Sequence, residues 1–380
     1  MRTMIVVTHL LGTGHLSRAL TLGRAFADAG HDVTVASGGM PAPQLNADGV
    51  SLLALPPLRS DGTDFTRLLT ADGDIADATY LNSRAIALTE AVRRVNPDVL
   101  ITELYPFGRR SLADEFLALL STARSLPSCP VVLSSVRDIL APPSKPAKAV
   151  RTEEIIVRFY DGVLVHSDPE ITPLDASWPV TGNLAGRLFY TGFVAPPAPG
   201  PHEQGEGANE ILVSAGGGSV GQPIFRAAIE AAQKMPNWRW RLLVGGQDAE
   251  DRIAELRHMT NGENVILEPV RPDFRQMLPL AAASVSMCGY NTAMDLLQCA
   301  TPAVLIPFDD GKEVEQTLRA KSLARLPAVD VLPSAKLTGE ALAQAVDRVL
   351  HQGPRKPLDG GFDGARKSVE IATSLWEARQ

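Results

Sequence analysis

Short runs of apolar, often β-branched residues alternate with amphipathic stretches along the first half of the chain. The runs have the length of buried strands and lie at 4–9, 31–37, 97–103, 129–135 and 161–167. After the first run, apolar positions recur at helical spacing from about residue 15 to residue 29. Continuous apolar strands that alternate with amphipathic helices are typical of a parallel sheet covered on both faces. The pattern therefore predicts a Rossmann-like first domain.

Residues 195–208, APPAPGPHEQGEGA, interrupt this alternation with a Pro-, Gly- and Glu-rich segment that has no apolar period. The alternation then restarts, with strand-like runs at 209–219, 238–246, 263–270, 283–288, 301–308 and 328–334. We expect an α/β fold of two Rossmann-like, doubly wound parallel-sheet domains that face a cleft at the carboxyl ends of their strands. The predicted parts are a domain at 1–194, a linker at 195–208, a domain at 209–363 and a last helix at 364–380 that could cross back onto the first domain.

Composition narrows the classes of protein to consider. Of the 380 residues, 45% are hydrophobic and 21% are charged, which is typical of a globular protein with a substantial core. The 36 basic and 43 acidic residues give a net charge of −7 without a basic block, so nucleic acid is not expected as a partner. The three widely spaced cysteines suit a reducing compartment.

The expected location is the cytoplasm. No apolar run approaches the roughly 20 residues of a transmembrane helix, and residues 1–14 resemble a buried strand more than a signal peptide, because His9 interrupts their apolar run. A peripheral position at the inner face of the membrane stays open.

Residues 214–223, SAGGGSVGQP, follow a predicted strand and precede a predicted helix. Consecutive glycines let a ligand approach the backbone, and the amides of Gly217, Gly218, Ser219 and Val220 would lie at the positive end of the helix dipole. The pattern favours a diphosphate-binding loop, and an ordinary glycine-rich turn is the alternative. Because no Lys-Ser/Thr pair follows the glycines, a nucleotide triphosphatase P-loop is excluded.

A second glycine-containing turn, GTGHLSR at 12–18, occupies the equivalent position in the first domain. Gly14 precedes His15 near the start of the predicted helix, and Arg18 follows one turn later. A helix N-terminus favours the neutral imidazole, which suits His15 as a general base near neutral pH. The alternative is that His15 caps the helix. Ser17 stands where a dinucleotide fingerprint requires glycine, so an NAD-type loop is disfavoured.

The segment ITELYPFGRRS, at 101–111, places a carboxylate at the end of a predicted strand and two arginines at a helix start. We expect Glu103, Arg109 and Arg110 to face the same cleft as His15, where they could bind an acceptor or an anionic group on it. Glu103 is also a second candidate for the general base. A strand-end salt bridge is the alternative interpretation.

Two segments of the second domain carry groups suited to a sugar nucleotide. Asp295 lies one turn into a helix that begins near Asn291, where a carboxylate can accept hydrogen bonds from ribose hydroxyls. Its alternative role is to complement the helix dipole. Further on, Asp309, Glu315 and Gln316 are residue types that bind sugar hydroxyls, and a solvated charged turn is the alternative.

A metal site is not expected. Asp72 and Asp74 form an Asp-x-Asp pair, but they lie in a polar, glycine-containing stretch typical of a loop or a helix cap. The histidines lack metal-ligand spacing, and no HExxH motif is present.

Together, the motifs GxGH, SAGGGS, CGYNTAMDLL and PFDDGKEVEQTLRA resemble those of the GT-B-fold, family 28-like glycosyltransferases. The resemblance extends over about 209–330 and, in the first domain, covers mainly the turn at His15. It implies a metal-independent, inverting transfer from a UDP-sugar to an acceptor hydroxyl, with no cofactor. The acceptor is left open among a sugar, a lipid-linked sugar and a small molecule.

The resemblance also implies roles for individual residues, and it places His15 near the reacting centre. From the reasoning on the residues themselves, we expect Glu103 there as well, and Gly14, Arg18, Arg109 and Arg110 on the acceptor side. The donor side comprises Gly216, Gly217, Gly218 and Ser219 for the diphosphate, Val270 and Phe274 for uracil, Asp295 for the ribose, Glu315 and Gln316 for the sugar, and Asn291, Thr292 and Asp309 as further donor-binding residues.

Three features depart from the family pattern: the doubled glycine before the histidine is reduced to TGH, the ribose glutamate is Asp295, and the asparagine often found after the glutamine is Arg319.

Two other functions stay open. The GHxxR form also resembles the UDP-sugar hydrolase of pseudaminic acid synthesis, which uses water as the acceptor. A non-catalytic nucleotide-sugar-binding subunit is the third possibility, but such a subunit would not need both His15 and the glycine loop.

Overall fold

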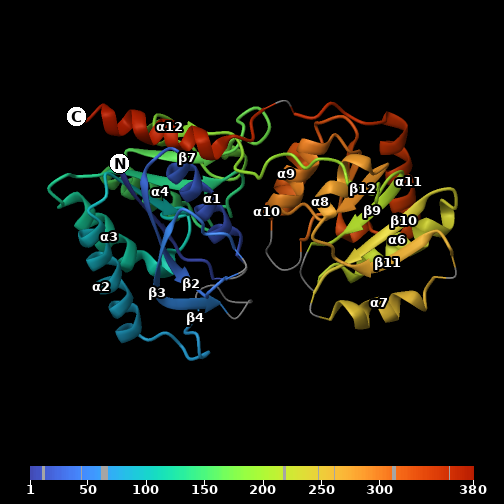
Figure 1. The fold of residues 1–380 in the computed structure, drawn as a ribbon, viewed down its shortest axis with the longest axis horizontal. Helices are drawn as coiled ribbons and strands as arrows, with labels where there is room; N and C mark the ends of the chain where they lie inside the picture. The colour runs from blue at the N-terminus through green and yellow to red at the C-terminus, as the bar shows by residue number, and fades with distance from the viewer. Residues whose placement is uncertain are drawn as a thin grey trace. The chain divides into compact units, whose positions relative to one another are not determined.

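The computed structural model describes residues 1–10, 13–43, 45–60, 67–216, 220–246, 248–260, 262–309, 314–358 and 360–380. The chain divides into two compact units (Figure 1). Unit 1 comprises Met1–Val194 and Gly361–Gln380, and unit 2 comprises Ala195–Gly360. Each unit is an α/β domain built on its own sheet, and in both sheets the strand order reverses next to the first strand. The predicted pair of Rossmann-like, doubly wound domains is confirmed.

Unit 1 contains an eight-stranded sheet with the order β4-β3-β2-β1-β5-β6-β7-β8. Its strands are β1 (Arg2–Val7), β2 (Asp32–Gly39), β3 (Ser51–Ser60), β4 (Leu68–Leu69), β5 (Val99–Glu103), β6 (Val131–Arg137), β7 (Gly162–His166) and β8 (Leu188–Tyr190). Only the β3–β4 pair is antiparallel within the described part of this sheet. Because the strand order reverses between β1 and β5, the chain segments that leave these two strands flank the crevice where doubly wound sheets bind ligands.

Helices cover both faces of this sheet, and β1 shows how the sequence achieves it. Met4 and Val6 belong to a core with helices α2 and α3, whereas Ile5 and Val7 belong to a second core with α1 and α12. The helices of unit 1 are α1 (Gly14–Asp28), α2 (Ala78–Val95), α3 (Ala113–Arg124), α4 (Pro146–Phe159), α5 (Gly182–Ala185) and α12 (Gly364–Glu377). Alternating residues of an apolar strand thus fill two cores, as a doubly covered sheet requires.

The last helix, α12, packs on unit 1 although it follows unit 2 in the chain. Val369 and Ala372 join the core of α1. The amide of Gly364 donates to the carbonyl of Phe193 at 3.0 Å. An added Cβ on Gly364 would lie 2.5 Å from the carbonyl oxygen of Gly192, so this close approach requires glycine.

Unit 2 contains a six-stranded parallel sheet with the order β11-β10-β9-β12-β13-β14. Its strands are β9 (Glu210–Ser214), β10 (Arg239–Val244), β11 (Val265–Pro269), β12 (Ala283–Ser286), β13 (Ala303–Leu305) and β14 (Val329–Val331). Its helices are α6 (Gln222–Lys234), α7 (Ala249–Arg257), α8 (Phe274–Met277), α9 (Tyr290–Cys299), α10 (Glu315–Leu323) and α11 (Gly339–Gln352). The strand order reverses between β9 and β12, which sets the switch point of this unit.

Residues 195–208 lack regular secondary structure, yet polar contacts anchor them to unit 2. Nδ1 of His202 accepts the amide hydrogens of Gln204 and Glu206, and Nε2 lies 2.9 Å from Oδ2 of Asp273. Arg241 in β10 adds an ion pair of 2.8 Å to Glu206. This aperiodic segment is therefore part of a folded unit.

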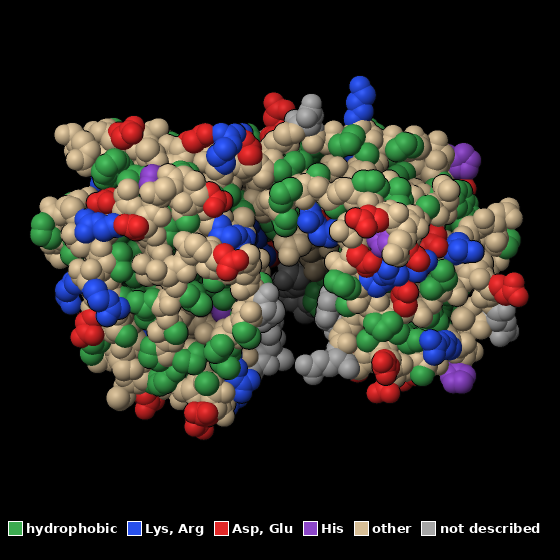
Figure 2. All heavy atoms as spheres, viewed as in Figure 1, with side chains coloured by type: hydrophobic (Ala, Val, Ile, Leu, Met, Phe, Trp, Pro, Cys, Tyr) green, Lys and Arg blue, Asp and Glu red, His purple; other side chains and the backbone are tan. Residues whose placement is uncertain are grey.

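Charged side chains of both signs are interspersed on the face drawn in Figure 2, and no continuous basic track crosses that face. Within the described ranges, no helix combines the length and the apolar character that a membrane span requires.

Candidate active site

The switch point of unit 1 brings His15 and Glu103 into contact. His15 is the second residue of α1, which follows β1, and Glu103 is the last residue of β5. Nδ1 of His15 lies 2.9 Å from Oε1 of Glu103. Thr13 at the start of α1 makes no side-chain cap, and the ring of His15 bonds to other side chains. The geometry therefore does not support His15 as a helix cap.

The pairing fixes the position of the proton on His15. An ionised carboxylate only accepts hydrogen bonds, so the Nδ1–H group of His15 donates to Glu103. Nη2 of Arg18 also lies 3.1 Å from Nδ1, but a protonated nitrogen cannot accept, and the Arg18 hydrogen bond goes to Glu103 instead. Nε2 of His15 then carries the lone pair, and none of the described residues donates to it. With 15% of its side chain exposed, His15 can meet a substrate hydroxyl.

The surroundings set the charges of this pair. Burial lowers the pKa of His15 below its usual value, and the positive charges of Arg18 and Arg109 add to the effect against the opposing pull of Glu103. Burial opposes ionisation of Glu103, but the charge of Arg18 and the hydrogen bond from His15 outweigh it and hold the pKa of this carboxyl well below its usual value. His15 is thus neutral and Glu103 ionised at neutral pH, which is the state that a base and its partner need.

Glu103 is suited to orient His15 rather than to act as the base itself. Its side chain is 1% exposed. It accepts hydrogen bonds from His15, from Arg18 and, at 2.7 Å, from Oγ of Ser135. A buried carboxylate with three donors and a lowered pKa is a poor proton acceptor. Of the two predicted candidates for the base, the geometry favours His15.

The three arginines Arg18, Arg109 and Arg110 have different surroundings. Arg18, predicted to bind the acceptor, is buried and is the counter-ion of Glu103. The alternative interpretation, a strand-end salt bridge, thus describes Glu103, with Arg18 as its partner. Arg109 donates to the carbonyl of Thr8 at 2.5 Å, and Arg110 lies over the ring of Trp178 at 5.6 Å. Of the two, Arg109 is the one whose charge acts on His15.

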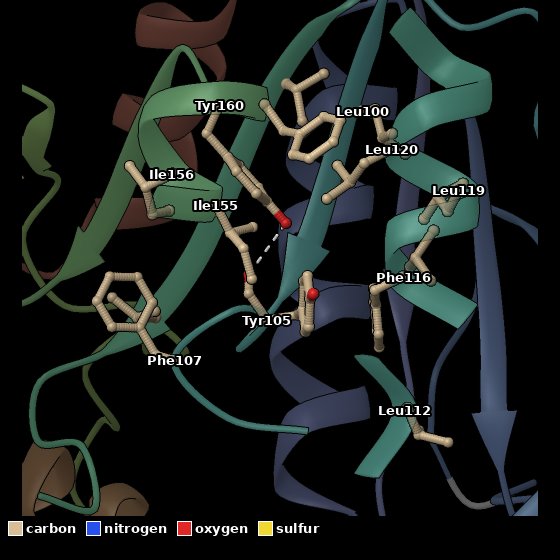
Figure 3. Close-up of a cluster of buried hydrophobic side chains, with 14 of the residues drawn as sticks. Leu100, Tyr105, Phe107, Leu112, Phe116, Leu119, Leu120, Ile155, Ile156 and Tyr160 are labelled. Atoms are coloured by element: carbon tan, nitrogen blue, oxygen red, sulfur yellow. Dashed lines mark hydrogen bonds between the residues drawn. The ribbon is translucent and has the colours of Figure 1, made fainter. Parts of the chain in front are cut away.

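The loop after β5 has an unusual backbone. Leu104 and Arg109 adopt positive φ angles of 69° and 58°, which cost energy for residues other than glycine and occur preferentially at functional sites. Tyr105 anchors the loop, because its ring stacks on Phe116 at 4.4 Å and its carbonyl accepts a hydrogen bond of 3.3 Å from Tyr160, drawn in Figure 3. The neighbouring aromatic core therefore holds the chain that continues from Glu103.

The switch point of unit 2 carries the glycine-rich turn. Gly216 lies two residues after the end of β9 and has a φ of +82°. Gly217, Gly218 and Ser219 lie outside the described residues. Gly221, with a φ of +94°, precedes α6, and a Cβ on it would lie 2.1 Å from Cβ of Ala215. Gly221 thus lies against Ala215 and leads into the N-terminus of α6, a position at which helices can bind anions.

Arg252 of α7 contacts the segment that follows the expected diphosphate loop, a role that the sequence did not reveal. Its guanidinium donates to the carbonyls of Val220 and Gly245 at 3.1 and 2.7 Å, and to Oε1 of Gln222 at 3.2 Å. It therefore joins the turn after β9 to the end of β10. Within the charged stretch AEDRIAELR, nothing distinguishes Arg252 from a surface arginine.

At the expected diphosphate site, Arg252→Met should weaken the binding of UDP roughly tenfold, or by about 1.4 kcal/mol, because the segment after β9 loses the three hydrogen bonds that hold it to the end of β10. Titration calorimetry with UDP measures the effect. Arg257→Met is the matched control, since Arg257 lies in the same helix but is exposed. Equal UDP affinities of the two variants would contradict a role for Arg252 in shaping the turn.

The residues expected at the nucleotide lie after β11 and in α8 and α9. Val270, 41% exposed, follows β11 directly, and Phe274 starts α8 half-buried. Asn291 and Thr292 occupy the first turn of α9. Asp295 lies in the second turn, where burial raises its pKa against the opposing effect of Arg275, whose Nε is 2.7 Å from Oδ1.

The residues expected at the donor sugar are spread over α10 and the loop before it. Oε1 of Gln316 accepts the amides of Cys288 and Phe308 at 3.0 and 3.1 Å, so the segments after β12 and β13 fix its side-chain amide. Glu315 is half-buried at the start of α10, and Asp309 is exposed and bonded to Ser334.

Arg319 lies on the buried side of α10 and donates to the Cys288 carbonyl at 2.9 Å. Gly14 on the acceptor side is exposed, and a Cβ on it would meet no described atom within 4 Å.

Among the described residues, no group of three His, Cys, Asp or Glu side chains could hold a metal ion.

Acidification should destabilise unit 1 through its buried histidines. Burial lowers the pKa of His166 to about 3 and lowers that of His15 as well. The unfolded chain therefore binds protons that the folded chain rejects, and stability present above pH 6.5 is lost as the pH falls toward the folded pKa values. Through His166 alone, the free energy of unfolding should fall by about 2 kcal/mol between pH 7 and pH 5. Urea unfolding at both pH values tests this, and an equal free energy of unfolding would contradict it.

The comparisons with known proteins agree with this architecture. Residues 212–359 match the glycosyltransferase family 28 C-terminal domain. The UDP-N-acetylglucosamine–N-acetylmuramyl-(pentapeptide) pyrophosphoryl-undecaprenol N-acetylglucosamine transferase of Levilactobacillus brevis is 32% identical over 139 residues, which are 35% of this chain and 38% of that protein. The chain thus matches less than half the length of this relative.

Solved structures extend the likeness to the whole fold. MurG of Acinetobacter baumannii superposes with a TM-score of 0.62 at 15% identity, over 100% of this chain and 99% of MurG. The calicheamicin glycosyltransferase CalG4 gives 0.61 at 17% identity, over 100% and 96%. A UDP-GlcNAc 2-epimerase of Methanocaldococcus jannaschii gives 0.58 at 13%, over 98% and 100%, so the fold serves more than one chemistry. The chain therefore has the GT-B fold, and residues 212–359 of unit 2 match the glycosyltransferase family 28 C-terminal domain.

Proposed function

We propose that the chain transfers a sugar from a UDP-sugar, bound by unit 2, to an acceptor hydroxyl that His15 deprotonates. The oxygen of the acceptor forms a bond to the anomeric carbon as the bond from that carbon to the UDP oxygen breaks. The proton of the hydroxyl goes to Nε2 of His15, and Glu103 stabilises the imidazolium that results. Attack from the face opposite UDP inverts the anomeric configuration.

The observation that carries this proposal is the buried His15–Glu103 pair with its lone pair on Nε2. A nucleotide-sugar-binding subunit would have no use for a neutral histidine oriented by a buried carboxylate. Glycosyl transfer to a hydroxyl needs such a base, and the family 28 C-terminal domain in the same chain supports a nucleotide-sugar donor.

The donor side is proposed to work without a metal ion or a cofactor. The diphosphate would bind at the N-terminus of α6, where backbone amides and the helix dipole stabilise the negative charge that develops on the leaving group. Asp295 would accept from the ribose, and the amide group of Gln316, which two backbone amides hold in place, would donate to the sugar.

Incubation with a panel of UDP-sugars, starting from UDP-N-acetylglucosamine, tests the function. Mass spectrometry should detect UDP and a glycosylated product only when a hydroxyl acceptor, from a set of sugars, lipid-linked sugars and small molecules, is present. Release of free sugar at the full rate without acceptor would identify a UDP-sugar hydrolase instead. Binding of UDP with no turnover under either condition would identify a binding subunit.

Turnover should survive EDTA, because the proposed diphosphate site uses backbone amides in place of a divalent cation. The rate of UDP release with millimolar EDTA should equal the rate with added Mg²⁺ or Mn²⁺. Loss of activity in EDTA that either cation restores would contradict this prediction.

The proposed setting is the cytoplasm, with the reaction at the inner face of the membrane if the acceptor is lipid-linked. The relative from Levilactobacillus brevis, by its name, acts on an undecaprenol-linked acceptor. Sedimentation with vesicles that contain a lipid-linked sugar distinguishes this class of acceptor from a dissolved one.

A further inference from the structure

A chain of buried hydrogen bonds continues from Glu103 through the next strands of the unit 1 sheet. Oγ of Ser135 lies 2.7 Å from Oε2 of Glu103 and 2.9 Å from Nε2 of His166. Nδ1 of His166 lies 2.9 Å from Oγ1 of Thr191. Ser135, His166 and Thr191 are fully buried. They come from β6, from the end of β7 and from the residue after β8, three adjacent strands of the sheet.

Only one arrangement of protons satisfies this chain. Because the carboxylate of Glu103 only accepts, the single hydrogen of Ser135 must go to it. Oγ of Ser135 then accepts from Nε2–H of His166. Burial lowers the pKa of His166 to about 3, so its ring is neutral and Nδ1 accepts from the hydroxyl of Thr191. The carbonyl of Gly192, 2.8 Å from Thr191, competes for that hydrogen but would leave Nδ1 without a donor.

Every hydrogen in this chain therefore points toward Glu103. Oε1 of Glu103 faces His15 and Arg18, and Oε2 is held by Ser135. Two fixed oxygens leave the carboxylate no freedom to rotate, and a fixed Oε1 is what keeps the proton of His15 on Nδ1. We propose that Ser135 and His166 are positioning residues that set the direction of Glu103 and, through it, the tautomer and basicity of His15. This inference rests on the proposed function of His15 as the base.

A purely structural clamp between strands is the competing explanation. Loss of such a clamp would change only the stability, whereas loss of a positioning chain would also change the pKa of His15. Removal of the Ser135 hydroxyl takes one donor from Glu103, whose charge then holds the proton of His15 more strongly. The acid limb of the pH profile of kcat/KM should therefore move to higher pH.

Ser135→Ala and Ser134→Ala form a matched pair. Both serines are fully buried in β6, and Ser134 donates to the carbonyl of Tyr105 at 2.8 Å, which keeps the donors Thr102 and Tyr160 after the change. Ser135→Ala should lower kcat roughly 10- to 100-fold, with the KM values and the UDP affinity within about twofold. Ser134→Ala should lower the melting temperature by a similar amount but leave kcat and the acid limb unchanged.

Variants of His166 test the second link. His166→Gln keeps an N–H group directed at Ser135 and should retain most of the activity, whereas His166→Leu removes it and should resemble Ser135→Ala. If Ser135→Ala and His166→Leu lower only the melting temperature, as Ser134→Ala does, the chain is structural and the inference is wrong.

Ring ¹⁵N NMR of selectively labelled histidines separates this inference from the proposed function, because it does not need turnover. The inference predicts a proton on Nδ1 of His15 and on Nε2 of His166. It also predicts a titration of His15 that shifts to higher pH in Ser135→Ala but not in Ser134→Ala. An unchanged titration of His15 in Ser135→Ala would overturn the inference, whereas absence of sugar transfer by the unmodified chain would overturn only the proposed function.

Discussion

His15→Asn should lower kcat/KM for sugar transfer by roughly 10²–10⁴-fold, the usual cost of losing a general base. The amide of asparagine can still donate a hydrogen bond toward Glu103, so the buried carboxylate keeps a partner on that side. What the variant lacks is the proton-accepting Nε2 atom. The melting temperature and the affinity for UDP should therefore stay close to those of the unmodified chain.

Steady-state rates, thermal unfolding and UDP calorimetry on the same preparations provide these measurements. His31→Asn is the matched control, because it makes the same change at a histidine of unit 1 whose ring lies beside the N-terminus and not at Glu103. Near-normal turnover of a folded His15→Asn chain would remove the base from the proposed mechanism. A large loss of stability with normal turnover would give His15 a structural role.

The strand ends were the part of the site that the sequence could predict. Glycine-flanked His15 after one apolar run and Glu103 at the end of another are both visible as local patterns. In a doubly wound sheet, the strands that carry them become neighbours when the order reverses, so their contact follows from the fold class. The same logic predicted the glycine-rich turn after β9.

The partners of buried charges could not be predicted in the same way. Arg18, Arg109 and Arg110 are equally plausible partners of Glu103 in the sequence, and only packing decides that Arg18 takes this place. Ser135 and His166 resemble ordinary strand residues, because their role depends on the registers of β5, β6 and β7. Contacts between strands distant in sequence leave no local signal.

The sequence analysis also did not predict β3, β4 and β8 of unit 1, and β3 shows a physical reason. β3 contains Pro56 and Pro57, and proline in an apolar run argues against a strand because it cannot donate to the ladder. The structure accommodates both residues where the register between β2 and β3 shifts, after the pair Ser37–Ala54. Tertiary pairing thus overrides the local signal.

Glu103→Gln should lower both the rate and the stability. The amide keeps the shape of the side chain but not the negative charge that stabilises the imidazolium of His15. The positive charge of Arg18, 3.1 Å from Nδ1, would still oppose protonation of His15, but no carboxylate charge at position 103 would offset it. We expect kcat to fall by roughly 10³–10⁴-fold, as when a catalytic histidine loses its carboxylate partner. The free energy of unfolding should fall by about 3–5 kcal/mol, because the variant breaks the buried ion pair between Arg18 and Glu103 by removing one of its two charges.

The double variant Arg18→Met/Glu103→Gln separates the two effects. Removal of both buried charges should restore most of the stability, since an apolar side chain can replace a buried ion at little cost. The rate should recover only in part, because the opposing charge is gone but the stabilising one is still missing. Glu115→Gln is the control, since it breaks another buried ion pair of unit 1, with Arg84 at 2.9 Å, and should reduce stability without a comparable loss of kcat. If the double variant regains the full rate along with its stability, Glu103 serves the fold alone and His15 needs no carboxylate partner.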